Sequence, residues 1–223
     1  MTPEVPDGTW LWLQRLTRWI GTWCFFVGYR LRVHHRDRIP TSGPVVVVAN
    51  HSATVDGPLL YGLLGRRMSF LIKQEMFRGP LGWILLRIGQ LAVRRGEADR
   101  APLLTAVRLL RAGGVVVVFP EGTRGEGDVD NAHQGAVWLA RTGGARLLPV
   151  AIRGTRRPPR SNRRFRPQVD VLIGEPFAVP PGRGRAVLAT ATNDMRNRLV
   201  ALVAELDQIR GLGVLRTMRP KGA

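Results

Sequence analysis

Runs of β-branched residues alternate with helical stretches along most of the chain. Residues 44–49 and 114–119 each contain four consecutive valines, a pattern typical of strands that are buried on both faces of a sheet. Residues 147–152 and 169–173 are predicted to form two more strands, and Pro149 favours a strand start or a bulge. These four segments supply the predicted core of one sheet.

Helices are predicted between and after these strands from the spacing of their apolar residues. They cover residues 58–64, 80–88, 101–112, 131–141 and 185–209. The alternation predicts an α/β fold with a mixed, largely parallel central sheet flanked by helices. We expect one such domain over residues 33–210, preceded by a polar N-terminus (1–9) and an amphipathic helix (10–32) and followed by a basic tail (211–223).

The segment 10–32 combines many tryptophans with a two-sided pattern. On a helical wheel, the apolar face carries Trp12, Leu13, Leu16, Trp19, Ile20, Trp23 and Val27, and the polar face carries Gln14, Arg15, Arg18 and Thr22. The longest uncharged run is 11 residues, whereas a spanning helix needs about 20. Indole rings opposite arginines suit the headgroup region of an anionic bilayer, so we predict a membrane-interface helix. The alternative is a helix packed on the rest of its own domain.

The charge of the chain points to anionic partners. Thirty-four lysines and arginines against 16 acidic residues give a net charge of +18, which suits nucleic acid, an acidic membrane surface or phosphorylated substrates. Cys24 is the only cysteine, so no internal disulfide forms, and residues 1–9 lack the basic start of a secretory signal. We therefore expect a peripheral or monotopic protein at the cytoplasmic face of the cell membrane.

Polar clusters follow two of the valine runs, where function gathers in α/β sheets. The first cluster spans residues 50–56 and the second 120–125. His51 is a candidate general base because imidazole titrates near neutral pH. Asp56, five residues later, is in reach of the other ring N–H. A His and an Asp at this spacing are more often structural than catalytic, and Ser52 lacks the G-x-S-x-G turn of a serine hydrolase.

The motifs together carry more information than the pair alone. HxxxxD at His51 and Asp56, followed about 70 residues later by EGTR at 121–124, resembles the glycerolipid acyltransferase family, most closely its 1-acylglycerol-3-phosphate acyltransferases. The stretch GQLAVRR at 89–95 and the stretch LPV at 148–150 are similar to two further blocks of that family. The second block departs from the family pattern at Ala92, usually aromatic, and at Arg94, usually an acid, which concerns substrate contacts.

The resemblance implies acyl transfer from a thioester, acyl-CoA or acyl carrier protein, to the free hydroxyl of 1-acylglycerol-3-phosphate. It implies no acyl-enzyme, no metal and no other cofactor. His51 would take the hydroxyl proton and Asp56 would orient His51. The implied substrate-binding residues are Glu121, Gly122, Thr123 and Arg124, with Arg95 and Lys73. Of these, Glu121 would hold the glycerol and the three basic residues its phosphate. Alternatively, Glu121 and Arg124 pair with one another, and Arg95 and Lys73 are solvated surface charges.

Two other stretches bear on lipid handling and on rival functions. Residues 76–86 form an apolar helix that lines an acyl-chain tunnel, touches the bilayer or belongs to the core. Residues 153–167 hold seven arginines and no acid and are expected to form a basic loop. That loop motivates a nucleic-acid-binding protein as the rival class, against which stand Asp56, Glu121 and the lack of a nucleic-acid motif. Acylation of a different lysolipid and an inactive lipid-binding protein are the remaining alternatives.

Overall fold

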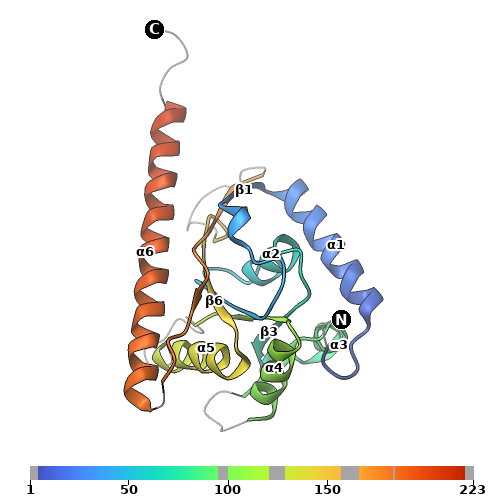
Figure 1. The fold of residues 1–223 in the computed structure, drawn as a ribbon. Coiled ribbons are helices and arrows are strands. Elements are labelled where there is room, and N and C mark those ends of the chain that lie inside the picture. The colour runs from blue at the N-terminus through green and yellow to red at the C-terminus, as the bar shows by residue number, and fades with distance from the viewer. Residues whose placement is uncertain (1–4, 95–99, 121–128, 157–165, 183, 219–223) are drawn as a thin grey trace.

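A single sheet runs through the molecule and is covered by helices on both faces (Figure 1). The computed structural model describes residues 5–94, 100–120, 129–156, 166–182 and 184–218. The strands are β1 (Arg30–His34), β2 (Val45–Ala49), β3 (Met68–Lys73), β4 (Leu91–Val93), β5 (Val115–Val118), β6 (Arg146–Arg153), β7 (Gln168–Ile173) and β8 (Phe177–Ala178). The helices are α1 (Leu11–Gly28), α2 (Asp56–Leu63), α3 (Gly79–Arg87), α4 (Ala101–Arg111), α5 (Val129–Gly143) and α6 (Arg185–Met218).

The strand order explains how the sheet is largely parallel but mixed. The strands follow the order β1-β7-β6-β2-β5-β3-β4, with β8 beside β6. Neighbours from β6 through β2, β5 and β3 to β4 are all parallel, and β1 is parallel to β7, whereas β6 is antiparallel to β7 and β8. The predicted fold class is confirmed.

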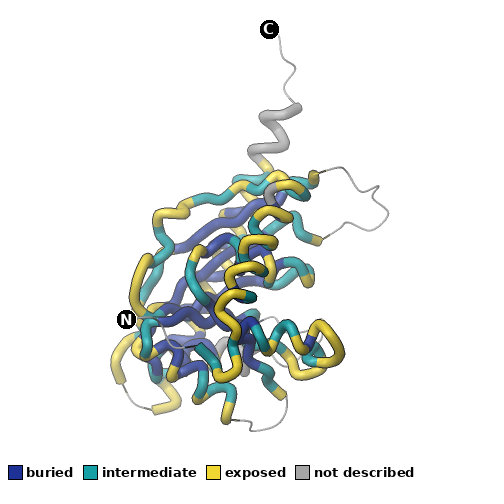
Figure 2. Tube along the Cα trace, turned by 90° about the vertical axis from the view of Figure 1, so that its right-hand side faces the viewer, coloured by how far each residue is buried: buried dark blue, intermediate teal, exposed yellow. Residues whose placement is uncertain are grey.

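The valine runs alternate between two hydrophobic cores. Val45 and Val47 of β2 point to the side covered by α1, α2 and α3, and Val46 and Val48 point to the side covered by α4, α5 and α6. In a strand, successive side chains face opposite ways, so a sheet with helices on both sides needs an apolar residue at every position. Figure 2 shows the buried strands as the dark centre of the fold.

Pro149 lies inside β6, which begins at Arg146, so the prediction of a strand start was wrong. One edge of β6 pairs with β2 throughout this region, with Val48 opposite Pro149. On the other edge the partner changes from β8, at residues 146–147, to β7, at residues 150–153. The Pro149 carbonyl accepts from Gly174 N on that same edge, at 2.9 Å. The missing N–H therefore falls where no ladder bond is required.

Several elements differ from the sequence-based expectation. Strands β1, β3, β4 and β8 were missed: β1 lies where the N-terminal helix and the following bridge were expected, because α1 ends at Gly28. These four strands lack an unbroken β-branched run, and β4 and β8 are only three and two residues long. At the other end, α6 continues to Met218, past its predicted end at residue 209 and into the predicted tail.

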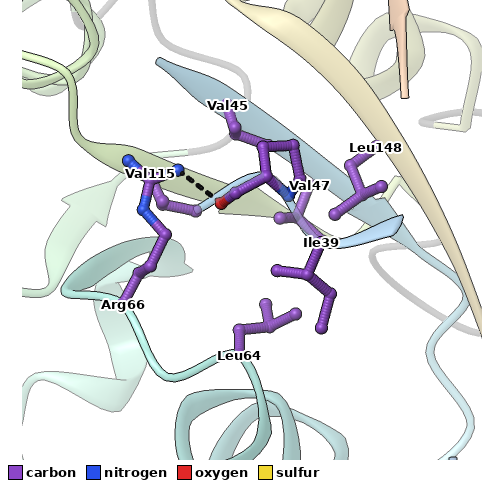
Figure 3. Close-up of a pocket in the computed structure, with 8 residues that line it drawn as sticks. Ile39, Val45, Val47, Leu64, Arg66, Val115 and Leu148 are labelled. Carbon is purple, nitrogen blue, oxygen red and sulfur yellow. Dashed lines mark hydrogen bonds between the residues drawn. The ribbon is translucent and has the colours of Figure 1, made fainter. Parts of the chain in front are cut away.

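A small apolar pocket lies at the amino ends of β2 and β5, at the opposite edge from the carboxyl-end clusters (Figure 3). Arg66, in the turn between α2 and β3, borders this pocket. Its guanidinium donates hydrogen bonds to the carbonyls of Pro40 (3.1 Å), Gly43 (2.6 Å) and Gly113 (2.6 Å). Burial lowers the pKa of Arg66. Arg66 thus joins the loops that lead into both central strands and has a structural role.

Candidate active site

His51 and Asp56 meet where β2 ends and α2 begins. Asp56 Oδ2 lies 3.1 Å from His51 Nδ1 and accepts backbone hydrogen bonds from Ser52 (2.7 Å) and Ala53 (2.8 Å). Asp56 is the first residue of α2, so its carboxylate also lies at the positive end of the helix. The Asp56 side chain is fully buried, whereas 33% of the His51 side chain is exposed. The ring can therefore meet a substrate while the carboxylate stays out of water.

The surroundings of Asp56 keep it ionised. Burial by itself raises the pKa of Asp56, but hydrogen bonds from His51, Ala53 and Ser52 and the nearby Thr155 hydroxyl outweigh it, and the pKa is lowered from 3.8. An ionised carboxylate only accepts hydrogen bonds, so the facing Nδ1 carries a proton. In the neutral ring, Nε2 is then the nitrogen that carries the lone pair.

Aromatic rings hold the His51 imidazole from one face. The ring of Phe119, which follows β5, stacks on His51 at 4.5 Å between centroids and 28° between planes. Phe70 of β3 stacks on Phe119 in turn, at 6.0 Å and 25°. The three stacked rings follow neighbouring parallel strands along the carboxyl edge of the sheet. They restrict rotation of the imidazole and form an apolar wall beside it.

Asn50 anchors the chain immediately before His51. Its side-chain amide donates to the carbonyl of Ile152 at 3.0 Å, and its side-chain oxygen accepts from the Ile152 N–H at 2.7 Å. Asn50 thus extends the β2–β6 pairing by one residue through its side chain. We did not predict this role, although a buried polar residue directly after an apolar strand was the available signal.

Basic side chains continue the same edge of the sheet beyond the aromatic rings. Lys73 is the exposed last residue of β3 and is paired in register with Val93 of β4. Arg94, the next residue, donates a hydrogen bond to the Gln74 side chain. Parallel strands lie about 4.8 Å apart, so β2 and β4, three strands apart, are separated by roughly 14 Å. His51 and these basic side chains therefore lie along one edge of the sheet.

The start of the GQLAVRR stretch is built into the sheet by side-chain hydrogen bonds. Gln90 Oε1 accepts from the Phe70 N–H at 2.7 Å, and Ser69 Oγ donates to the Gly89 carbonyl at 2.7 Å. Gly89 has a φ of +77°, and a Cβ there would lie 2.9 Å from Thr9 Oγ1. These contacts direct β4, and Arg94 after it, to the carboxyl edge.

Five of the predicted substrate-binding residues are not covered by this description. Arg95, Glu121, Gly122, Thr123 and Arg124 lie outside the described residues, as does most of the arginine-rich stretch. The chain is described up to Pro120, directly after Phe119. Of the predicted substrate-binding set, Lys73 is therefore the member that the structure describes, and the roles of the other five stay predictions.

Helix α1 packs on the domain with a side that carries polar residues as well as the core-packed Leu13 and Phe25. Gln14 is buried and donates to the Ile88 carbonyl at 3.2 Å, and Thr22 Oγ1 bonds to the Gly62 carbonyl of α2 at 3.2 Å. A Cβ at Gly62 would lie 3.0 Å from the Thr22 nitrogen, so glycine permits this close approach. The large apolar residues of α1 that are exposed are Leu11, Trp12, Leu16, Trp19, Ile20, Trp23 and Val27. Helix α1 therefore packs on its own domain, as the alternative expected, but most of the apolar face of the helical wheel lies outside that contact.

Helix α3 extends this exposed apolar surface. Leu81, Trp83 and Leu86 are about half exposed, whereas Ile84 and Leu85 pack against the core, so α3 is not simply a core helix. Trp83 contacts Trp10 edge to face at 5.3 Å, and the Arg87 guanidinium lies 4.9 Å from the Trp10 ring centre. Within the described residues, no helix is both long and apolar enough to cross a membrane.

Together, the fold and the site define an α/β enzyme with a histidine–carboxylate pair at the carboxyl edge of its sheet. Residues 30–153 match the acyltransferase family. The chain is 31% identical to 1-acyl-sn-glycerol-3-phosphate acyltransferase of Bacillus subtilis over 80% of its length and 91% of that protein. The chain belongs to the acyltransferase family, as the HxxxxD and EGTR motifs predicted.

Two further comparisons agree with this assignment. A Pseudomonas aeruginosa 1-acyl-sn-glycerol-3-phosphate acyltransferase is 27% identical, over 83% of this chain and 75% of that protein. The crystal structure of the PlsC acyltransferase from Thermotoga maritima matches with a TM-score of 0.66 at 24% identity, covering 88% of this chain and 79% of that one. The structural match supports the fold, and the family supports an O-acyltransferase over a nucleic-acid-binding protein.

Proposed function

We propose that this enzyme moves a fatty acyl group from an acyl thioester to the free hydroxyl of 1-acylglycerol-3-phosphate, giving phosphatidic acid. The observation that carries this proposal is the contact between a partly exposed His51 and a buried, ionised Asp56 at the carboxyl edge of the sheet. The names of the family relatives support the choice of acceptor.

The chemistry follows from the orientation of the His51 ring. With Nδ1–H held by Asp56, Nε2 accepts the proton of the acceptor hydroxyl as its oxygen attacks the thioester carbonyl. The Asp56 carboxylate stabilises the imidazolium that forms. An ester C–O bond forms, the thioester C–S bond breaks, and the imidazolium returns its proton to the departing thiolate. No covalent acyl-enzyme is needed, and the step calls for no metal or other cofactor.

The acceptor phosphate is proposed to lie toward β3 and β4. Lys73 at the end of β3 supplies one positive charge there, and Arg95 and Arg124 are proposed to supply two more, because a guanidinium matches phosphate bidentately. Glu121 is proposed to hold the glycerol. The N–H groups around Gly122 and Thr123 are the proposed donors to the oxyanion. The donor is acyl-CoA or acyl carrier protein, both of which present the same thioester.

The enzyme is further proposed to act as a peripheral protein on an anionic membrane surface at its cytoplasmic face. The outward indoles of α1 and α3 support this, because an apolar surface of that kind in water would favour association with lipid. The net charge of +18 adds attraction to acidic headgroups. Such a location would bring the active site to a lysophospholipid acceptor without extracting it from the bilayer.

The proposal is tested by measuring thiol release from an acyl thioester by the purified protein in anionic vesicles. Lysophosphatidic acid is compared with lysolipids that lack a terminal phosphomonoester, and His51→Ala is the control. Turnover that requires lysophosphatidic acid supports the proposal. Turnover only with another lysolipid would support the proposed roles of the His51–Asp56 dyad but would contradict phosphate binding by Lys73. Salt-sensitive DNA binding without any thiol release would favour a nucleic-acid-binding protein.

A further inference from the structure

One carboxylate oxygen of Asp56 has no hydrogen-bond donor among the described residues. Oδ2 of Asp56 receives His51 and the backbone of Ser52 and Ala53. Oδ1 is buried and makes no hydrogen bond of ordinary geometry to any described residue. A buried, charged oxygen without a hydrogen-bond donor lowers the stability of the folded protein. A hydrogen bond from a nearby donor to Oδ1 is therefore favourable.

Such a donor comes from the strand beside β2. Thr155 follows β6 by two residues, and its Oγ1 is likewise buried without a hydrogen bond of ordinary geometry in the described part of the chain. The Thr155 hydroxyl nevertheless lies close enough to Asp56 to help lower the pKa of that carboxyl. Among the described residues, the Thr155 hydroxyl and the Asp56 Oδ1 atom are thus both buried and both without a hydrogen-bond partner.

The position of Thr155 is set by the register of β6 and by the turn at Gly154. β6 is held in register beside β2, with Val150 opposite Ala49, and the Asn50 side chain locks Ile152. Gly154 then turns the chain with a φ of +90°, and a Cβ there would lie only 2.2 Å from the Gln168 carbonyl oxygen. A substituted residue at position 154 is excluded, so the turn that aims Thr155 depends on glycine.

We propose that Thr155 is a positioning residue of the dyad, whose hydroxyl donates to Asp56 Oδ1. This inference rests on the proposed function of His51 and Asp56. With Oδ1 held by Thr155, the carboxylate cannot rotate about its Cβ–Cγ bond, and Oδ2 stays aimed at Nδ1. The bond strengthens the orientation of His51 when the imidazolium forms, and it leaves substrate binding unaffected. Thr155 acts through Asp56 and touches no reacting atom.

The test compares Thr155→Val, which keeps the shape and removes the hydroxyl, with Thr155→Ser, which keeps the hydroxyl. Thr155→Val is expected to lower kcat about tenfold with KM unchanged for both substrates, because a misaligned base slows the chemical step alone. Thr155→Ser is expected to restore most of kcat. Thr192→Val removes another buried threonine hydroxyl, on α6, and serves as the matched control with wild-type kcat.

A double-mutant cycle separates positioning from a general loss of structure. In an Asp56→Asn background, Thr155→Val is expected to cause no further loss of kcat, because the group through which it acts is already gone. A tenfold loss in both backgrounds, or full kcat in Thr155→Val, overturns the proposal. Thermal unfolding of each variant identifies any effect that comes from instability.

A spectroscopic readout keeps this test independent of the acceptor. The downfield proton resonance of His51 Nδ1–H, assigned by its loss in His51→Ala, reports the contact with Asp56 directly. Thr155→Val is expected to move this resonance upfield and Thr155→Ser to leave it near its wild-type position. An unmoved resonance in Thr155→Val refutes the positioning role. If the wild-type enzyme transfers no acyl group, the proposed function fails while this measurement still decides the role of Thr155.

Discussion

His51 Nδ1 and Asp56 Oδ2 lie 3.1 Å apart across the turn from β2 to α2, one side chain reaching solvent and the other fully buried. This division agrees with the proposed roles, proton transfer for the histidine and orientation for the aspartate. Removing either group is therefore expected to leave different residual rates.

His51→Ala is expected to abolish acyl transfer, and Asp56→Asn to lower kcat by roughly 10³–10⁴-fold, because the amide favours the wrong tautomer of the ring. The measurement is single-turnover thiol release at saturating thioester, with circular dichroism to confirm that both variants fold. A folded His51→Ala variant with normal turnover contradicts the assignment of the base. Equal residual rates in the two variants would contradict the supporting role of Asp56.

The ionisation of Asp56 makes folding stability depend on pH. The pKa of Asp56 is lower in the folded protein than its ordinary value of 3.8, because the hydrogen bonds from His51, Ala53 and Ser52 and the nearby Thr155 hydroxyl outweigh the effect of burial. The unfolded chain therefore binds this proton first as the pH falls. The stabilisation from Asp56 is complete above its ordinary pKa and is lost as the pH falls through the folded pKa.

We expect the free energy of unfolding of the wild type to fall on acidification below about pH 4 more steeply than that of Asp56→Asn. Urea unfolding from pH 7 to pH 3 measures this difference. The Asn variant is the control because it shares every other titrating group with the wild type. Parallel pH dependences in the two proteins would show that the carboxylate gains nothing from its partners.

The sequence carried enough information for the central fold and for the dyad. The unbroken valine runs identified β2 and β5, because a sheet buried on both faces needs apolar residues at every position. HxxxxD then placed His51 and Asp56 in one turn, where the structure has them. The sequence pattern did not predict β1 and β4, because these edge strands are short and half exposed and their pairing depends on distant residues.

Other site residues left no local signal in the sequence. Thr155 reaches Asp56 because β6 lies beside β2, a long-range pairing that spacing along the chain does not reveal. The stacking of Phe119 on His51 depends on the neighbouring position of β5 in the same way. The outward direction of the α1 apolar face also required the structure, since a helical wheel shows two faces and not which of them packs.

Arg66 is expected to contribute to stability and not to catalysis. Its three hydrogen bonds join the loops before β2 and β5 at the amino edge of the sheet. Arg66→Met, which keeps the bulk, is expected to lower the free energy of unfolding by about 2–3 kcal/mol. Arg66→Lys should recover part of this, because an ammonium keeps the charge but lacks the planar fork. Urea unfolding measures these free energies. The control is Arg108→Met, which replaces an exposed arginine on α4.

Lys73 is expected to distinguish acceptors by their phosphate. Lys73→Met should raise KM for lysophosphatidic acid about tenfold with little change in kcat, because the charge acts on a distant group of the substrate. A lysolipid without a phosphomonoester should show no such increase if it is turned over. The exposed Arg108→Met variant again controls for a general loss of surface charge. An equal rise in KM for both acceptors would remove Lys73 from the phosphate site.

The exposed indoles of α1 are expected to carry the membrane contact. Trp12, Trp19 and Trp23 are each more than half exposed, whereas Gln14 on the opposite side is buried. Replacing the three tryptophans with serine is expected to weaken binding to anionic vesicles at least about tenfold, because interfacial binding scales with buried apolar area. Vesicle sedimentation at fixed salt measures this effect. The fold should persist, since these side chains make no core contact.

A matched variant identifies the face of the molecule that meets the lipid. Leu104 on α4 and Val200 on α6 are as exposed as these indoles but lie on the other side of the sheet. Leu104→Ser with Val200→Ser should leave vesicle binding unchanged if α1 forms the contact. An equal loss in both sets would mean that exposed apolar area acts without regard to its position, and binding retained by the tryptophan variant would contradict a role for α1. Because α3 adjoins α1 through Trp10 and Trp83, Trp83→Ser is expected to weaken binding as well, by less than the triple replacement.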